Sequence, residues 1–132
     1  MTPKRYPPTD PREWLNRAKS NLVRAEAMTS GAYLEDLCFD AQQAAEKAIK
    51  AVFVHRGEPF PYIHDIEELL DRLSINGVKV PKYVRQADKL SQYAVATRYP
   101  GAAGPITKKQ HRRAIRIAKL VLGWAERMAT KP

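Results

Sequence analysis

The sequence predicts an all-α protein, an antiparallel up-and-down bundle of four main helices plus one short helix. Apolar residues recur at steps of three and four between the prolines and glycines that punctuate the chain. Two of these periodic segments also begin with the residue pattern of a capping box, which is typical of helix N-termini. No alternating run of strand length competes, because the β-branched stretch at 75–80 is interrupted by Asn76 and Gly77.

The first helix is expected to begin at Asp10, an N-cap residue followed by a proline and by Glu13 in the capping-box position, and to end near Gly31. The second helix is expected over about 33–56, with Gly57 ending it. Alanine is frequent in this second segment, and small residues let a neighbouring helix approach closely. The apolar rows are Leu15, Ala18, Leu22 and Ala25 in the first helix, and Leu34, Cys38, Ala41, Ala45, Ala48 and Val52 in the second.

A shorter third helix is expected to start near His64 and to stop at an Asn-Gly pair, and a fourth follows Pro81. The fifth begins at a second capping box, Thr107 with Gln110, and extends to about Met128. Their apolar rows are Ile66, Leu69, Leu70 and Leu73 in the third, Val84, Ala87, Leu90 and Ala94 in the fourth, and Ala114, Ala118, Val121, Ala125 and Met128 in the fifth.

Length and composition indicate one small domain. The chain has 132 residues, which predicts a single helical domain over 10–129 after an N-terminal extension over 1–9. With 44% hydrophobic and 28% charged residues, it is not a disordered chain. No apolar run approaches the roughly 20 residues of a membrane span, and no signal peptide is visible. The single Cys38 cannot form an internal disulfide, so we expect a cytoplasmic protein without membrane association.

The positive charge is concentrated in the last part of the chain. The formal net charge is +9 overall, but residues 1–81 carry −1 and residues 82–132 carry +10. A one-sided basic surface attracts phosphates or an acidic protein partner through long-range forces that salt weakens. A basic face that only keeps the protein in solution is the alternative interpretation.

Neither a metal site nor a cofactor is expected. The histidines His55, His64 and His111 and the one cysteine show no paired spacing of metal ligands, and there is no phosphate-binding glycine loop or nucleophile motif. The acidic residues at 65–71 occupy the first turns of the third helix, where the helix dipole favours anions. A solvated helix face explains them.

The strongest site prediction lies at the start of the fifth helix. Cations at a helix N-terminus oppose the helix dipole, so a group of them there indicates a bound anion such as a phosphate. The preceding loop adds an arginine, an aromatic ring that can stack on a base, and small residues. Contact with a partner protein, and cations that only extend into water, are the alternatives. The predicted phosphate-binding or nucleotide-binding residues are Arg98, Tyr99, Lys108, Lys109, Arg112 and Arg113.

A second candidate is His64, at the start of the third helix. The helix dipole would hold this histidine neutral, so that it can donate or accept a hydrogen bond. The sequence favours a structural interpretation, in which His64 belongs to the cap that fixes the loop at 59–61. A catalytic role is the second interpretation.

Three groups of residues resemble a known family. They are the stretch 38–51, CFDAQQAAEKAIKA, with Gly57 after it; His64-Asp65-Ile66 with Leu69-Leu70; and Arg98-Tyr99-Pro100. Over roughly residues 10–128 the chain is thereby similar to the HEPN domain family of prokaryotes. The AQQAAEKAIKA stretch, followed by a proline-containing loop and HDI, is a fairly specific signal.

The resemblance implies a helical up-and-down bundle that is often a homodimer. Many HEPN proteins are encoded beside a minimal nucleotidyltransferase and form a two-component, toxin–antitoxin-like pair with it. Some are metal-independent ribonucleases that use an arginine followed after four to six residues by a histidine, the pair facing its mate across a dimer. Others have been proposed to bind nucleotides.

The chain departs from the ribonuclease motif. Seven residues separate Arg56 from His64, across a proline loop, and twelve separate Arg98 from His111. The chain is closer to the branch of the family that lacks the motif, in which nucleotide or partner binding is the expected role.

We therefore expect a homodimer that is the partner-dependent half of a nucleotidyltransferase–HEPN pair and that binds nucleotide or RNA phosphates. One alternative is a metal-independent ribonuclease in which Arg98 and either His111 or His64 converge despite their spacing, since an Arg–His pair can supply charge stabilisation and proton transfer. The other is a purely structural protein-interaction module, whose basic face meets an acidic protein.

Overall fold

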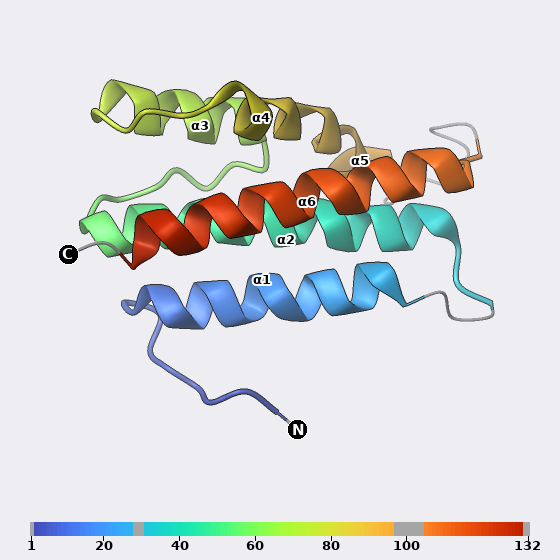
Figure 1. Cartoon of the computed structure of the whole chain (residues 1–132), viewed down its shortest axis with the longest axis horizontal. Coiled ribbons are helices and arrows are strands. Elements are labelled where there is room, and N and C mark those ends of the chain that lie inside the picture. The colour runs from blue at the N-terminus through green and yellow to red at the C-terminus, as the bar shows by residue number, and fades with distance from the viewer. Residues whose placement is uncertain (1, 28–30, 97–104, 131–132) are drawn as a thin grey trace.

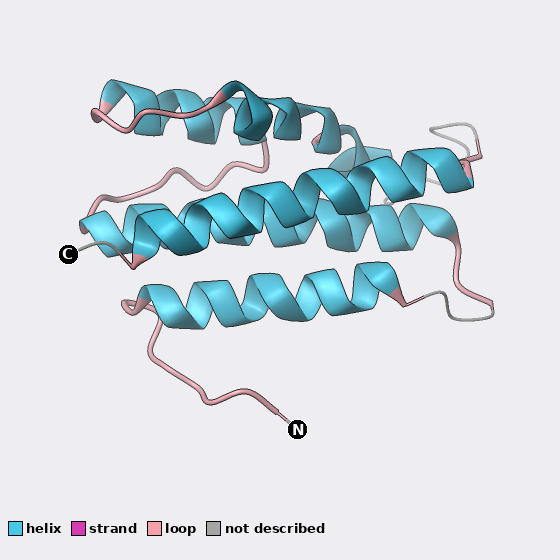
Figure 2. Cartoon of the chain, viewed as in Figure 1, coloured by secondary structure: helices cyan, strands magenta, loops and turns pink. Residues whose placement is uncertain are grey.

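The computed structural model of the chain describes residues 2–27, 31–96 and 105–130. Figure 1 shows a bundle of helices, and Figure 2 shows only helices and loops in the described part. The predicted all-α fold is therefore confirmed. In chain order the elements are α1 (Pro11–Glu26), α2 (Leu34–Arg56), α3 (Ile66–Ile75), α4 (Lys82–Arg85), the 3-10 helix η1 (Gln86–Leu90), α5 (Gln92–Ala96) and α6 (Lys108–Ala129).

The helices α1 and α2, the segment α4–α5 and the helix α6 alternate in direction along the chain, as predicted for the main helices, whereas the short α3 runs in the same direction as α2 (Figure 1). Figure 1 shows α1 running against α2, and α4 and α5 running against α6. Two ion pairs fix α1 against α6: Lys19 Nζ lies 3.3 Å from Glu126 Oε2, and Lys119 Nζ lies 3.1 Å from Glu26 Oε2. Because low residue numbers of α1 meet high numbers of α6, these two helices are antiparallel as well. Figure 1 also shows that α1 and the segment α3–α5 lie on opposite sides of α2 and α6.

The start of α1 differs in one contact from the predicted capping box. Asp10 is the N-cap, and its Oδ1 accepts a hydrogen bond from the Arg12 amide at 2.9 Å. The carboxylate of Glu13 does not turn back to Asp10; it accepts from the Tyr6 amide at 2.9 Å instead. Two further hydrogen bonds hold the N-terminal extension on α1. Trp14 Nε1 donates to the Pro8 carbonyl, and Asn16 Nδ2 donates to the Lys4 carbonyl. The extension therefore replaces Asp10 only as the partner of the Glu13 carboxylate.

The end of α1 was expected near Gly31, and this boundary is wrong. The helix ends at Glu26, because Ala27 has extended backbone angles of φ −75° and ψ 104°. Ala25 is the last buried member of the apolar row within α1. Residues 28–30 lie outside the described part of the chain.

The predicted fourth helix is broken into α4, η1 and α5. The backbone stays right-handed through Arg85 and Ser91, but its middle adopts the tighter 3-10 winding. The spacing of the buried residues gives the reason. Side chains three residues apart stack on one face only when a helix has three residues per turn. In this segment the buried residues follow one another at steps of three: Val84, Ala87, Leu90 and Tyr93. Tyr93 was not in the predicted row, which ended instead at the neighbouring Ala94, and Ala94 is buried as well.

The centre of the bundle is α2, which contacts α1, α3, η1, α5 and α6. It ends at Gly57, whose φ of +67° is left-handed, and the amides of Gly57 and Glu58 donate to the carbonyls of Val54 and Phe53 at 3.0 Å. The predicted apolar rows of α3 and α6 are buried against the same core. None of the helices in the described segments combines the length and hydrophobicity that crossing a membrane requires.

We predict opposite effects for alanine at two glycines. Gly57→Ala should lower the free energy of unfolding by about 1 kcal/mol, because an L residue is strained at this φ even though nothing lies within 4 Å of the added Cβ. Gly123→Ala, inside α6, should raise it by about 0.5 to 1 kcal/mol. Urea denaturation measures both changes. Two changes of the same sign would contradict the left-handed backbone assigned to Gly57 or the ordinary helical backbone assigned to Gly123.

Candidate functional site

The start of α6 is a well-formed helix N-terminus. The hydroxyl of Thr107 accepts from the Gln110 amide at 3.1 Å, and the Thr107 amide donates to Gln110 Oε1 at 2.8 Å. The predicted capping box is thus confirmed. Because the cap satisfies backbone donors without any charged group, nothing in it offsets the positive end of the helix dipole.

Five cations follow this cap, and all five are exposed. Within the described ranges none of them lies within ion-pair distance of a carboxylate, whereas each of the four cations of α1 does. The contrast is informative, because unpaired cations repel one another and oppose the helix dipole. An external anion would relieve both effects. The five are Lys108, Lys109, Arg112, Arg113 and Arg116.

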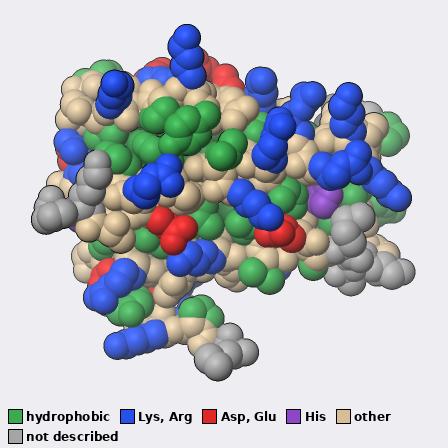
Figure 3. Space-filling model, viewed as in Figure 1, with side chains coloured by type: hydrophobic (Ala, Val, Ile, Leu, Met, Phe, Trp, Pro, Cys, Tyr) green, Lys and Arg blue, Asp and Glu red, His purple; other side chains and the backbone are tan. Residues whose placement is uncertain are grey.

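Four of these side chains converge on one open hollow. Residues three, four and seven apart lie on one face of a helix, so Lys109, Arg112, Arg113 and Arg116 project to the same side of α6. They line a hollow of about 370 Å³. Figure 3 shows Lys and Arg side chains gathered at the end of the molecule where α6 begins. A hollow lined by four cations can hold a phosphate through several charge-assisted hydrogen bonds at once.

The structure brings together part of the predicted set. Lys109, Arg112 and Arg113 share the hollow, and Arg116 joins them, although the predicted set stopped at Arg113. The signal for Arg116 was present in its spacing, three and four residues after the two preceding arginines. The predicted Arg98 and Tyr99 lie outside the described residues.

A neighbouring hollow of about 310 Å³ lies between the end of α1 and the start of α6. Lys108 and Arg112 contribute cations to it, and Glu26 contributes a carboxylate. His111 forms part of its wall, but this side chain is only 5% exposed, and its Nε2 lies 2.7 Å from the carbonyl oxygen of Ala25. A carbonyl only accepts, so Nε2 carries a proton and donates it to this bond. His111 therefore joins α6 to α1.

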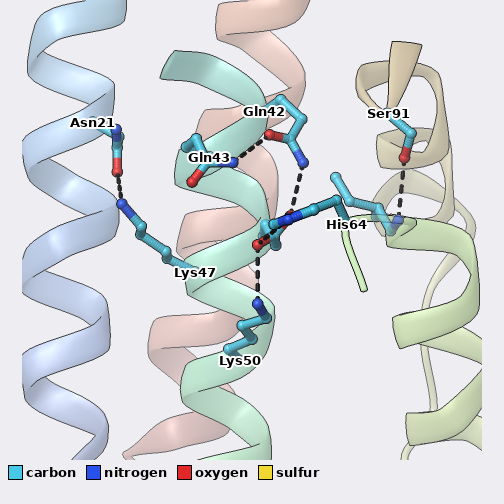
Figure 4. A network of polar contacts seen from close by, with 9 residues as sticks. Asn21, Gln42, Gln43, Lys47, Lys50, His64 and Ser91 are labelled. Atoms are coloured by element: carbon cyan, nitrogen blue, oxygen red, sulfur yellow. Dashed lines mark hydrogen bonds and ion pairs between the residues drawn. The ribbon is translucent and has the colours of Figure 1, made fainter. Parts of the chain in front are cut away.

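His64 lies in a different part of the molecule, on the chain between α2 and α3. Its Nδ1 is 3.0 Å from Oε1 of Glu46, a carboxylate of α2 that is almost fully buried. The same carboxylate accepts from Gln42 Nε2 and from Lys50 Nζ, both at 3.0 Å. Figure 4 shows these three side chains converging from α2 and from the segment before α3. The His64 side chain is 58% exposed, so Glu46 orients a ring that solvent reaches.

Sequence reasoning did not find this role of Glu46. The signal in the sequence was a carboxylate among the alanines of the predicted second helix. The N-cap of α3 is Asp65, which accepts from the amides of Glu67 and Glu68. His64 thus fixes the loop by binding α2 rather than by capping α3. Among the described residues no group of three or more His, Cys, Asp and Glu side chains is placed to hold a metal ion.

The surroundings of Cys38 disfavour thiol chemistry. The side chain is completely buried in α2. Burial and the nearby Glu35 raise the pKa of the Cys38 thiol to about 11, against a lowering effect of the hydrogen bond with Tyr93. At neutral pH the group is the protonated thiol, which is a poor nucleophile.

We predict that Glu46 stabilises the fold in a pH-dependent way. Burial alone would raise the pKa of Glu46, but the bonds from Lys50, Gln42 and His64 outweigh burial and lower the pKa below its ordinary 4.5. Stability from this lowered pKa is present above pH 4.5 and is lost as the pH falls through the folded-state pKa. At pH 7, Glu46→Gln should cost about 2 kcal/mol, because Lys50 loses its charged partner.

Urea denaturation of Glu46→Gln and wild type at pH 7 and below pH 4 measures this effect, and the difference should narrow at the lower pH. Glu58→Gln is the control, since its ion pair with Arg56 is near the surface and should contribute less than about 1 kcal/mol. A constant difference across the pH range would show that the charge of Glu46 is not what stabilises the fold.

The fold and sequence have known relatives. Residues 11–128 match the family model described as the HEPN domain. The structure is similar to the crystal structure of TT1696 from Thermus thermophilus, with 36% sequence identity and a TM-score of 0.78 over 89% of this chain and 97% of that one. It is also similar to ST0689, an archaeal HEPN homologue, with 27% identity and a TM-score of 0.75 over 92% of this chain and 98% of that one.

A search of curated protein sequences gives no match. The family model nevertheless spans nearly the whole chain, and both structural relatives cover almost all of it. The chain therefore belongs to the HEPN domain family.

Proposed function

We propose that this HEPN-domain protein binds the phosphates of a nucleotide or of RNA at the start of α6. The observation that supports the proposal is the hollow lined by Lys109, Arg112, Arg113 and Arg116, four cations without a carboxylate partner in the described ranges. A chain that pairs every cation of α1 leaves these unpaired at the cost of mutual repulsion. A phosphate ligand offsets that cost in the bound state.

The chemistry of the four side chains suits a phosphate group. Three of the four are arginines, whose planar guanidinium binds two phosphate oxygens at once. Such contacts position a nucleic acid without identifying its bases. Arg98 and Tyr99, in the segment before α6, belong to the same proposal, as a further cation and a ring for a base.

The family supports a cellular context for this binding. We propose that the protein is a cytoplasmic homodimer and the partner-dependent half of a nucleotidyltransferase–HEPN pair of the toxin–antitoxin kind. Native mass spectrometry of the protein captured from its own cells tests this context. A dimer carrying a second chain of nucleotidyltransferase size is the expected species, and a bare dimer or monomer would contradict the pairing.

One observation favours a second candidate function, a metal-independent ribonuclease. The buried Glu46 holds Nδ1 of a His64 side chain that is more than half exposed, and a histidine oriented by a carboxylate is an arrangement that suits proton abstraction from a 2′-hydroxyl. His111, by contrast, is buried and bonded to Ala25. Cleavage of RNA by the purified protein should then fall about a hundredfold in His64→Gln but not in His55→Gln. No cleavage, or equal cleavage, removes this candidate.

Charge reversal tests the phosphate site directly. Lys109→Glu combined with Arg112→Glu should weaken the binding of a fluorescent single-stranded RNA by about a hundredfold at low salt, because two cations of the hollow become anions. Fluorescence anisotropy gives the affinity, and circular dichroism checks that the helices are retained.

A matched control changes the net charge equally at a distance from α6. Arg72→Glu combined with Lys79→Glu alters two exposed cations in and after α3 and should change the affinity by less than about threefold. If both double variants bind equally well, the site assignment is wrong. If wild type prefers an acidic polypeptide and ignores RNA, the protein-interaction alternative replaces the proposal.

A further inference from the structure

The exposed face of α6 extends well beyond the phosphate hollow. The seven residues on it follow one another at helical spacing from residue 109 to residue 127, which corresponds to about 27 Å along the helix axis. A single phosphate occupies only one end of such a surface. We call this face the α6 stripe, and its members are Lys109, Arg112, Arg113, Arg116, Leu120, Gly123 and Arg127.

Gly123, near the C-terminal end of the stripe, is not required by the packing of the described residues. Glycine inside a helix costs about 1 kcal/mol relative to alanine. Among the described residues an added Cβ would meet only Arg127 Nη1, at the ordinary contact distance of 3.6 Å, so none of these neighbours requires a glycine here. Glycine is the residue that lets another molecule approach a backbone closely. The position thus points to a ligand outside the chain.

Apolar and aromatic surface flanks Gly123. Leu120 is 40% exposed on the stripe, and Tyr83 of α4 is 39% exposed beside it. The Tyr83 hydroxyl accepts a hydrogen bond from Arg127 Nη2 at 2.9 Å, which holds the phenol against α6. Figure 3 shows hydrophobic surface next to Lys and Arg side chains over this part of the molecule. Cations for phosphates and a ring for a base are the two elements of single-strand recognition.

The arrangement of the helices disfavours two other occupants. A helix that reads duplex DNA must enter the major groove, but α6 is packed into the bundle, with α1 on one side and α4 on the other (Figure 1). A second copy of the chain on this face would bring the cations of one α6 against those of the other. A polyanion with apolar bases avoids both difficulties.

We propose that the ligand of this surface is a single-stranded oligonucleotide that lies along the α6 stripe. Its phosphates contact Lys109, Arg112, Arg113 and Arg116, and a base further along the strand stacks on the Tyr83 ring over Gly123. This inference rests on the proposed function and deepens it, because it selects a strand of about four or more nucleotides over a mononucleotide.

The first test is the dependence of affinity on strand length. Fluorescein-labelled oligouridylates of two, four, eight and twelve nucleotides are titrated with the full chain. Affinity should rise about tenfold or more between the shortest strand and the eight-nucleotide strand and then level off, as the stripe becomes filled. Equal affinity for all lengths, or for uridine monophosphate, would overturn the proposal.

The second test uses variants outside the phosphate hollow. Tyr83→Leu should lower the affinity for the eight-nucleotide strand about tenfold. The affinity of Tyr83→Phe, which keeps the ring, should stay within about twofold of wild type. Gly123→Met should raise the melting temperature, since methionine favours the helix, but it should lower the affinity for the strand severalfold because its side chain blocks the approach to the backbone. A loss of binding in Gly123→Met cannot then be attributed to unfolding.

The outcomes separate this inference from the proposed function. If charge reversal at Lys109 and Arg112 abolishes binding but the Tyr83 and Gly123 variants bind like wild type, the phosphate site stands and the strand path is wrong. If neither group of variants matters, both fail. If polyglutamate competes with the oligonucleotide as well as unlabelled oligouridylate does, and Tyr83→Leu has no effect, the surface binds an acidic protein and the proposal is overturned.

Discussion

The close burial of α2 is the constraint on which the rest of the structure depends. All five alanines between positions 41 and 51 are fully buried, and small side chains let α1 and α6 approach on two sides. The polar side chains that are buried in such a helix have no access to solvent, so each requires a partner within the protein. Glu46 meets that requirement with Gln42, Lys50 and His64 together, and in doing so fixes the chain that enters α3.

This packing also determines what α6 presents outward. Its alanine-rich row, with Ala118 and Ala125 completely buried, faces α2. The remaining side of α6 carries charged residues. Along its border with α1, Glu26 and Glu126 form ion pairs with lysines of the facing helix. No carboxylate of the described ranges reaches the cations of the first turns. The unneutralised positive charge is therefore a consequence of how the helices are placed, and an anionic ligand is the simplest group that neutralises it.

Much of the fold follows from the sequence because local signals agree with the packing. The apolar rows, the capping box of Thr107 and the glycine after α2 each specify one element. The misjudged features depend on tertiary contacts: Glu13 bonds to Tyr6 across seven residues, and a row that steps by three tightens the segment after Pro81. For the site, the group of cations at the start of the predicted fifth helix indicated three members of the hollow. The bond between Glu46 and His64 spans eighteen residues, a distance that no local pattern encodes.

The central claim is that unpaired cations on α6 bind a phosphate backbone, and the salt dependence of binding tests it most directly. A single-stranded oligonucleotide is titrated with the protein at several concentrations of potassium chloride. If four cations each displace a counterion, the logarithm of the association constant should fall linearly with the logarithm of salt concentration, with a slope of about −3. A slope near zero, or no binding at the lowest salt, would contradict the account.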